Sequence, residues 1–495
     1  MSRRSPFTLL ANGASLPWRK IADWPGDEFV RLSAAELERG ARLVSWFGVP
    51  EPHGATRLVG VLAYDADNTL AVARSHPLTG TVPSITARQP QAHLFEREVF
   101  EEHGLRPVGH PWLKPVRRYG ADGPGVMDFF KVDGAEVHEV AVGPVHAGII
   151  EPGHFRFQCA GEDVLHLEIA LGYQHRGIER ALFGGPHRST FAQMETIAGD
   201  TTVGHGTAHA MVMEGLAGAD EAPLRAQWLR AIALELERLA NHTGDIGALA
   251  GDVAFLPTQS ACGKIRGDLL NLTAAICGNR FGRGLVRPGG CRHDLEPDRV
   301  RQVTPRLEQA LKDVLQACEW MWDAASVRAR FENTGPVTAE QAREIGLVGL
   351  AARSCGLVRD VRFDQPAGWH RFGQVPVAVW PGGDVFARAR VRTIEIERSG
   401  RYLLEQLASP PEGPVFTQAT APVADTFAVA LVEGWRGEIC HAVLTGTDGR
   451  YRRYKITDPS FHNWTGLALA LRGQAISDFP VCNKSFSLSY CGFDL

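Results

Sequence analysis

Long stripes of apolar residues at helical spacing do most to constrain how this 495-residue chain can fold. One stripe lies on a single helical face and contains Leu224, Trp228, Leu229, Ile232, Leu236 and Leu239. A second stripe contains Leu307, Leu311, Val314, Leu315 and Cys318. Thr304 and Pro305 precede it as an N-cap and a first-turn proline. Thr338 and Gln341 have capping-box spacing and predict a third helix. Such faces must be buried against neighbours, so the pattern predicts a core of long helices beyond about residue 150.

The two ends of the chain have a mixed pattern. Residues 56–64 alternate as a strand does, and the helical run 94–103 stops at Gly104. A glycine-rich break at 119–125 marks a domain boundary. Near the other end, strand-like segments 427–432 and 438–444 flank a turn, and the aromatic tail 478–495 is expected in the core. The predicted fold class is α+β, with a small α/β domain at 1–120, a linker at 121–137 and a large domain with a long-helix core at 138–495.

Composition excludes several classes of protein. A net charge of -4 offers no basic excess for nucleic acid. No stretch approaches the roughly 18 apolar residues of a spanning helix, and the first 20 residues lack a secretory apolar run, so the chain is expected to be cytoplasmic. The nine cysteines are odd in number and contain no C-x-x-C pair, which argues against disulfides and against a thiolate metal centre.

Several motifs stand in order along the chain: residues 143–146 (GPVH), 151–154 (EPGH), 175–179 (HRGIE), 235–242 (ELERLANH), 287–290 (RPGG), 433–437 (EGWRG) and 458–464 (DPSFHNW). Together they resemble the large subunit of group 4 nickel-iron hydrogenases and its descendant, the hydrogenase-like large subunit of respiratory complex I. The motifs at 95–99 and 109–111 resemble the small hydrophilic complex I subunit. A fusion of the two units resembles the formate hydrogenlyase type of large subunit.

The resemblance also points to a lost metal site. In the family, two C-x-x-C pairs hold nickel and iron, and soft sulfur ligands suit those metals. The corresponding positions here carry Ala198 and Thr201, then Ser489 and Gly492, so no metal ligand is expected. Cys482 and Cys491 lie near the second pair without a matching upstream pair, which favours core cysteines.

The resemblance implies four site residues. Glu151 and His154 match the acidic residue and histidine that pass protons beside the metal, Arg436 matches the arginine above the open metal position, and His205 matches a family histidine. Glu151 and Arg436 could equally form a structural ion pair in an emptied cavity. Complex I relatives place a quinone in that cavity and hold it with a tyrosine, whose position falls at or near Gly199 here.

Two further motifs have alternative interpretations. His205 and His209 have a spacing that can bind zinc, but Gly206 replaces the glutamate of a metalloprotease, which favours core or cavity-lining histidines. The turn at 175–179 is either a local helix entry or, as the resemblance implies, a docking corner for the iron-sulfur subunit.

The resemblance therefore implies a core subunit of a membrane-associated oxidoreductase of the complex I (NADH dehydrogenase) or group 4 hydrogenase type, with electron transfer coupled to ion translocation. This chain would hold no cofactor except a quinone in the vacated cavity. Its partners would be a small subunit with iron-sulfur clusters and a membrane arm, at the inner face of the cell membrane. The alternatives are a non-catalytic scaffold or coupling subunit and an intact nickel-iron hydrogenase, against which the missing ligands argue.

Overall fold

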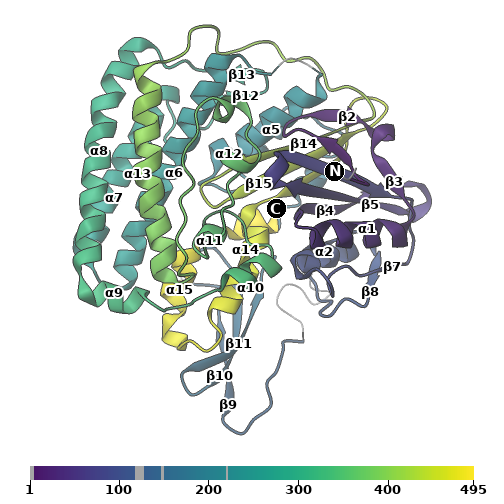
Figure 1. The fold of residues 1–495 in the computed structure, drawn as a ribbon, viewed down its shortest axis with the longest axis horizontal. Helices are drawn as coiled ribbons and strands as arrows, with labels where there is room; N and C mark the ends of the chain where they lie inside the picture. The colour runs from purple at the N-terminus through teal and green to yellow at the C-terminus, as the bar shows by residue number, and fades with distance from the viewer. Residues whose placement is uncertain (1–4, 118–127, 147–149, 219–220) are drawn as a thin grey trace.

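The computed structural model describes residues 5–117, 128–146, 150–218 and 221–495. Figure 1 shows a helical bundle on one side, a sheet domain on the other, and a small antiparallel sheet that projects below them. The glycine-rich break predicted at 119–125 lies outside the described residues. The α+β class predicted from the sequence is confirmed.

The N-terminal domain is built on one five-stranded sheet. Its path runs β1-β6-β5-β4, and β3 pairs in parallel with β6. These strands are β1 (Thr8–Leu10), β3 (Ala22–Trp24), β4 (Arg42–Pro50), β5 (Thr56–Tyr64) and β6 (Thr69–Ser75). Helices α1 (Gly26–Glu38) and α2 (His93–His103) and a two-stranded sheet of β7 (Thr81–Pro83) and β8 (Arg106–Val108) complete the domain. Gly104 ends α2 in the left-handed conformation, as predicted.

The four long helices of the bundle are α6 (Leu224–Asp252), α7 (Leu256–Cys277), α8 (Pro297–Asp323) and α13 (Val385–Ala408). They pack side by side, α6 against α7 and α13, and α8 against α7 and α13 (Figure 1). Most of the predicted α6 stripe is buried, from Trp228 to Leu239, whereas Leu224 is 52% exposed because it begins the helix.

The predicted start of α8 is wrong. The helix begins at Pro297 with Glu296 as its N-cap, so Thr304 and Pro305 lie inside it. The Thr304 hydroxyl donates to the Val300 carbonyl at 2.8 Å, a back-bond within the helix. Burial of Val303, Leu307 and the following stripe in the bundle outweighs the hydrogen bond that the proline cannot make.

A second sheet of four strands lies between the bundle and the N-terminal domain. Its order is β16-β15-β14-β2, all antiparallel, from β2 (Ser15–Pro17), β14 (Thr426–Glu433), β15 (Glu438–Thr445) and β16 (Tyr451–Thr457). Strand β2 belongs to residues 1–120, yet it pairs with β14 of the large domain. The remaining strands are β9 (Val137–Val142), β10 (His154–Ala160) and β11 (Asp163–Ala170) of the projecting sheet, and the pair β12 (Val286–Arg287) and β13 (Gly290–Cys291).

Short helices connect these layers. They are α3 (Ile178–Ala181), α4 (Thr190–Met194), α5 (Thr202–Leu216), α9 (Ala325–Phe331), α10 (Ala339–Glu344), α11 (Gly349–Arg353) and α12 (Val361–Asp364), then α14 (Pro459–Ala470), α15 (Phe479–Phe486) and α16 (Tyr490–Asp494). The tail is buried as predicted, including Phe479, Phe486, Tyr490 and Phe493.

A buried charge cluster joins the bundle to β14. Glu395 of α13 forms an ion pair with Arg353 at 2.6 Å, and it accepts hydrogen bonds from Arg238 at 3.1 Å and from His242 at 2.7 Å. Arg353 also binds Glu433 at 2.7 Å. The other members are Glu235, Asp360 and Arg362, and all eight side chains are buried. Each charge in this cluster has a partner, which a low-dielectric interior requires.

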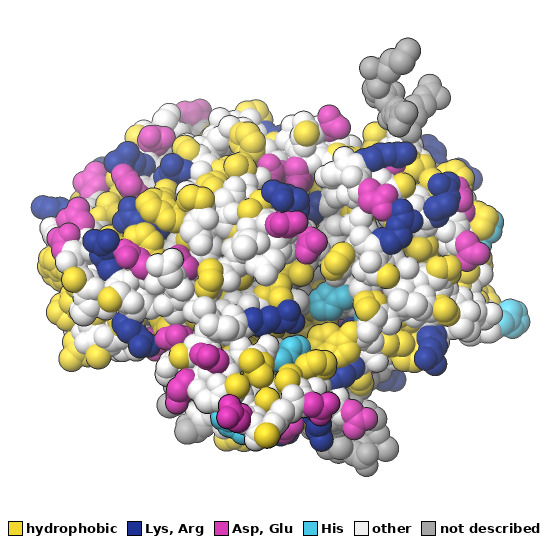
Figure 2. Space-filling view, turned by 60° about the horizontal axis from the view of Figure 1, so that its bottom comes forward, with side chains coloured by type: hydrophobic (Ala, Val, Ile, Leu, Met, Phe, Trp, Pro, Cys, Tyr) yellow, Lys and Arg dark blue, Asp and Glu magenta, His cyan; other side chains and the backbone are white. Residues whose placement is uncertain are grey.

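Among the residues that the structure describes, no helix combines the length and the apolarity that crossing a membrane requires. On the face in Figure 2, basic and acidic side chains are interspersed and form no single basic patch.

The capping box predicted at Thr338 is present. The Thr338 hydroxyl accepts from the Gln341 amide at 3.1 Å, and the Gln341 side chain accepts from the Thr338 amide at 3.0 Å. We expect Thr338→Ala to destabilise α10 by about 1 kcal/mol. Hydrogen exchange at the amides of Ala342 and Ile345 should then accelerate about five-fold, since local opening becomes easier. Glu344→Ala, at the exposed far end of the helix, is the control, and equal exchange in both variants would contradict the role of the cap.

Candidate functional site

A cavity of about 1130 Å³ lies between α6, α7, the turn that joins β14 to β15, and the C-terminal tail. Glu151 and Arg436, two of the predicted site residues, line it. Aromatic side chains form part of its wall: Phe157, Trp435, Phe479 and Tyr490. Charged side chains also line it, namely Asp200, Asp245, Asp252, Arg266 and Lys484. A cavity of this size, with an apolar wall and a few charged groups, is typical of a ligand site.

Arg436 is fixed by hydrogen bonds and by an aromatic ring. Its guanidinium donates two hydrogen bonds to Asp200, at 2.7 and 2.8 Å, and one to the Ser487 carbonyl at 2.5 Å. The Trp435 ring lies 3.9 Å from the guanidinium carbon. Burial alone would lower the pKa of Arg436, but the Asp200 carboxylate outweighs it and raises that pKa above its ordinary value. Arg436 therefore stays charged, and its carboxylate partner is Asp200, which the sequence did not identify.

The turn that carries Arg436 depends on close backbone contacts. Arg238 donates to the carbonyls of Glu433 at 2.8 Å and Gly434 at 3.3 Å. On the other side, Gly349 has φ of +59°, and a Cβ there would lie 2.1 Å from the Gly437 Cα. Only glycine fits this approach between α11 and the turn.

Glu151 and His154 are close in sequence but differ in environment. The Glu151 carboxylate accepts from the Tyr490 amide at 3.2 Å and faces the cavity. His154, at the start of β10, bonds the Gly143 carbonyl through Nδ1 at 3.1 Å and does not line the cavity. Burial lowers the pKa of His154. The structure therefore brings Glu151 and Arg436 to one cavity, whereas His154 does not line it.

His205 belongs to a separate buried network. Its Nε2 lies 3.1 Å from Asp458 Oδ2, and its Nδ1 lies 3.1 Å from His441 Nε2. Tyr454 hydroxyl continues the network to His441 at 2.8 Å and to His209 at 2.9 Å. Burial lowers the pKa of His209 to about 4, so this imidazole is neutral. His205 and His209 do lie on one helix, α5, but the described residues contain no group of three side chains that could hold a metal ion.

The four positions matched to thiolates lie close to these groups. Thr201 Oγ1 is 3.3 Å from Arg436 Nη1 and 3.2 Å from Trp435 Nε1. Ser489 Oγ accepts from the Gly492 amide at 2.9 Å, and a Cβ at Gly492 would lie 2.7 Å from Asp458. The Ala198 carbonyl accepts from the Thr201 amide at 3.0 Å. These positions supply two hydroxyl oxygens, both already hydrogen-bonded, and no sulfur.

The nearby cysteines are thiols. Burial raises the pKa of Cys491 to about 12 and that of Cys482 to about 12. Cys482 is buried in α15, and a Cβ at Gly335 would lie 2.5 Å from its sulfur. Both side chains are therefore protonated thiols at neutral pH in the structure as it stands.

The 175–179 turn connects distant segments. Arg176 donates to the carbonyls of Thr196 and Ile197 at 2.8 and 2.9 Å, and His175 bonds the Asp494 carbonyl at 2.8 Å. Glu179 forms an ion pair with Lys455 at 3.1 Å. The turn thus ties the segment before α5 to the tail, and its predicted contact with an iron-sulfur subunit stays a prediction.

Comparison with known proteins identifies the family. The model of the respiratory-chain NADH dehydrogenase 49 kDa subunit matches residues 252–426, and that of the 30 kDa subunit matches residues 34–124. The carbon monoxide-induced hydrogenase of Rhodospirillum rubrum is 30% identical over 352 residues, which cover 70% of this chain and 96% of that protein. The chain belongs to this family of complex I and hydrogenase large subunits.

One further relative agrees with this family assignment, and a solved structure shares the fold. Formate hydrogenlyase subunit 5 of Escherichia coli is 29% identical over 435 residues, covering 82% of this chain and 76% of the relative. A chain of the membrane-bound sulfane sulfur reductase, an archaeal respiratory membrane complex, has the same fold, with a TM-score of 0.68 at 24% identity. That match covers 74% of this chain and all of the other. The resemblance given by the sequence motifs, including the fused N-terminal unit, is confirmed.

The glycine contact beneath the Arg436 turn gives a test of this geometry. We expect Gly349→Ala to destabilise the protein by about 2 kcal/mol or more, because the new methyl group meets backbone and the positive φ adds strain. The thermal unfolding midpoint should fall accordingly. Gly263→Ala is the control, since Gly263 lies in α7 on the same cavity and a Cβ there meets nothing within 4 Å. An unchanged midpoint for Gly349→Ala would contradict the close approach.

Proposed function

We propose that this chain is the core large subunit of a membrane-associated oxidoreductase of the complex I or group 4 hydrogenase type, and that it carries no nickel-iron centre. The observation that supports this most is the Asp200–Arg436 pair, next to hydroxyl and methyl groups where the family has thiolates. In this proposal the subunit lies at the inner membrane face between a small iron-sulfur subunit and a membrane arm. Its role is electron transfer coupled to ion translocation.

The residues present do not fit a nickel-iron centre. Two of the four positions, Ala198 and Gly492, have no side-chain donor atom, and the hydroxyls of Thr201 and Ser489 are hard, neutral ligands. A nickel-iron pair needs four soft, charged sulfur ligands to be held in place. The proposed electron and proton transfer therefore involves no such centre in this chain.

A quinone is the occupant that the cavity favours. Its aromatic wall suits a flat ring, and Tyr490 places a buried phenol on that wall even though Gly199 lacks the tyrosine of the complex I relatives. Burial raises the pKa of Tyr490 to about 12, so it stays a hydrogen-bond donor at neutral pH. A quinone becomes a quinol by taking two electrons and two protons. We assign the electrons to the clusters of the iron-sulfur subunit and the protons to the cavity side, where Glu151 lies.

Metal analysis tests the first part of the proposal. We expect the assembled complex, purified through this chain, to contain under about 0.1 nickel per chain, because no soft ligand set is present. A relative with both C-x-x-C pairs, purified from the same host, is the control. Stoichiometric nickel would overturn the assignment of the four positions.

Substitution of Tyr490 tests whether a quinone binds in the large cavity. We expect Tyr490→Phe to lower kcat/KM for quinone reduction about ten-fold while the complex still assembles, because one hydrogen bond to the headgroup is lost and the ring is kept. Tyr451→Phe is the control, since Tyr451 is buried in β16 outside the cavity. Equal rates in both variants would contradict a role for Tyr490. A complex without quinone reductase activity would favour the scaffold or coupling subunit.

A further inference from the structure

A continuous series of hydrogen bonds runs through the core of the large domain. Its members, in spatial order, are a carboxylate, two imidazoles, a phenol and a third imidazole: Asp458, His205, His441, Tyr454 and His209. The four links measure between 2.8 and 3.1 Å, and two of the three histidines use both ring nitrogens. Every member can both bind and release a proton, so each link is able to pass one on.

One end of this series keeps contact with solvent. His205 and His441 are fully buried, and Tyr454 and Asp458 are each only 1% exposed. His209 is 3% exposed, and it bonds Tyr454 through Nδ1. Its Nε2 has no hydrogen-bond partner among the described residues, yet it is not one of the described polar atoms that are sealed from solvent without a partner. This nitrogen is therefore the atom through which the series can exchange protons with water.

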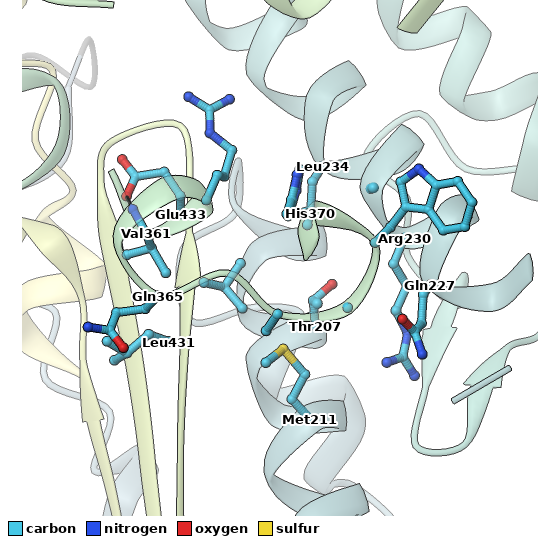
Figure 3. Close-up of a pocket in the computed structure, with 16 residues that line it drawn as sticks. Thr207, Met211, Gln227, Arg230, Leu234, Val361, Gln365, His370, Leu431 and Glu433 are labelled. Atoms are coloured by element: carbon cyan, nitrogen blue, oxygen red, sulfur yellow. Dashed lines mark hydrogen bonds between the residues drawn. The ribbon is translucent and has the colours of Figure 1, made fainter. Parts of the chain in front are cut away.

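The series lies on one face of α5. The two histidines of this helix are one turn apart, and they contact the next members on β15 and β16. On the opposite face of the helix, Thr207 and Met211 reach toward the segment that carries His370 (Figure 3). The packing of one helix against two neighbouring strands therefore holds the rings of the series at fixed distances from one another.

The inner end of the series lies at the positions matched to thiolates. Asp458 caps α14 with one carboxylate oxygen and binds His205 with the other. A Cβ at Gly492, one of the four matched positions, would lie 2.7 Å from this carboxylate. Asp458 also interacts electrostatically with Arg436 and Asp200, which line the large cavity. A change of charge at the inner end therefore acts on the charged pair of the cavity wall.

The ionised carboxylate sets the direction of every hydrogen bond in the series. Burial alone would raise the pKa of Asp458, but the hydrogen bond from His205 and a nearby guanidinium outweigh it and lower that pKa. Because a carboxylate only accepts, His205 donates through Nε2, and its Nδ1 accepts from His441. His441, whose pKa burial lowers well below its ordinary value, accepts from Tyr454 at Nδ1. Tyr454 then accepts from His209, whose Nε2 lone pair stays open at the surface.

We propose that this series is a proton wire, which carries a proton from solvent at His209 to the His205–Asp458 pair. A proton that binds His209 Nε2 releases the Nδ1 proton to the Tyr454 oxygen. The hydroxyl proton of Tyr454 passes to His441 Nδ1, and the Nε2 proton of His441 passes to His205 Nδ1. At each of the three relaying members one N–H or O–H bond forms as another breaks, and no electron moves. His205 ends as an imidazolium that the Asp458 carboxylate stabilises.

The inference rests on the proposed function for its purpose. Electrons that reach a quinone in the large cavity bring negative charge, and a proton on His205 balances this charge without entering the cavity. Glu237 of α6 accepts from the backbone amides of Val203 and Gly204, so it caps α5 and is not a member of the wire. The charged and titratable groups that face the His205–Asp458 pair are Asp200, Glu237, Arg436, His441, Tyr454 and His462.

Nitrogen NMR of the assembled complex with isotope-labelled histidine tests the wire without turnover. The signals of His205 and His441 are assigned by their loss in His205→Gln and His441→Gln. We expect their ring protons to exchange with heavy water at least about ten-fold faster than the backbone amides of β15, which exchange only on local opening. In Tyr454→Phe, which removes the central hydroxyl and keeps the ring, this ratio should fall by about ten-fold or more. Tyr451→Phe is the matched control, because the Tyr451 hydroxyl contacts Met213 on the same strand pair outside the wire.

Each outcome decides the proposal. Ring protons that exchange no faster than the β15 amides in the unmodified complex would overturn the wire, whichever variants assemble. The same ratio in Tyr454→Phe and Tyr451→Phe would overturn it as well. If Tyr454→Phe does not assemble, His209→Phe, which removes the entry nitrogen, should lower the ratio in the same way, and an unchanged ratio would count equally against the wire. Because this readout uses neither nickel nor quinone, the wire can fail while the proposed function stands, and the reverse.

Discussion

Glu395 is the group on which the rest of this structure depends. It is fully enclosed at the centre of the bundle and joins Arg353 of α11, Arg238 of α6 and His242 of α6 to α13. Removing one partner from such a buried set leaves an uncompensated charge and typically costs about 3–5 kcal/mol. The same arginines hold the end of β14, Arg353 through the Glu433 side chain and Arg238 through backbone carbonyls. The position of the Arg436 turn therefore follows from the ionic core.

The turn separates two spaces of different chemistry. On one side Arg436 is held by Asp200 and the Ser487 carbonyl, at the wall of a large cavity with aromatic surfaces. Glu433, at the end of β14, lines a separate and mostly apolar pocket of about 50 Å³. Glu433 and Arg436 are three positions apart in sequence. The backbone of one short turn therefore positions both side chains. A subunit that lost a metal centre and kept this turn would still have Arg436 and Asp200 in place beside the vacated site.

Local sequence patterns predicted the elements, because their causes are local. The apolar stripe on α6, the glycine stop of α2 and the capping box of α10 each depend on residues within a few turns of each other. The start of α8 was predicted wrongly because tertiary burial overrides the cost of a proline inside a helix. Motifs of the family, rather than periodicity, placed Glu151 and Arg436 on one cavity.

The partners of the site residues could not be predicted in this way. Asp200 and Arg436 are 236 positions apart, and His205 finds Asp458 at a separation of 253. His441 and Tyr454 lie on neighbouring strands, and only their register brings them to α5.

The central claim is that protein groups, the Asp200–Arg436 pair and the hydroxyls of Thr201 and Ser489, stand where the family holds its metal centre. An experimental map of the assembled complex by electron cryomicroscopy tests it most directly, at a resolution that separates the Arg436 guanidinium from its neighbours. The account predicts continuous density for the Asp200–Arg436 pair and only protein atoms between Thr201 and Ser489. Density for a metal ion coordinated there, or an Arg436 side chain turned away from Asp200 into the cavity, would contradict it.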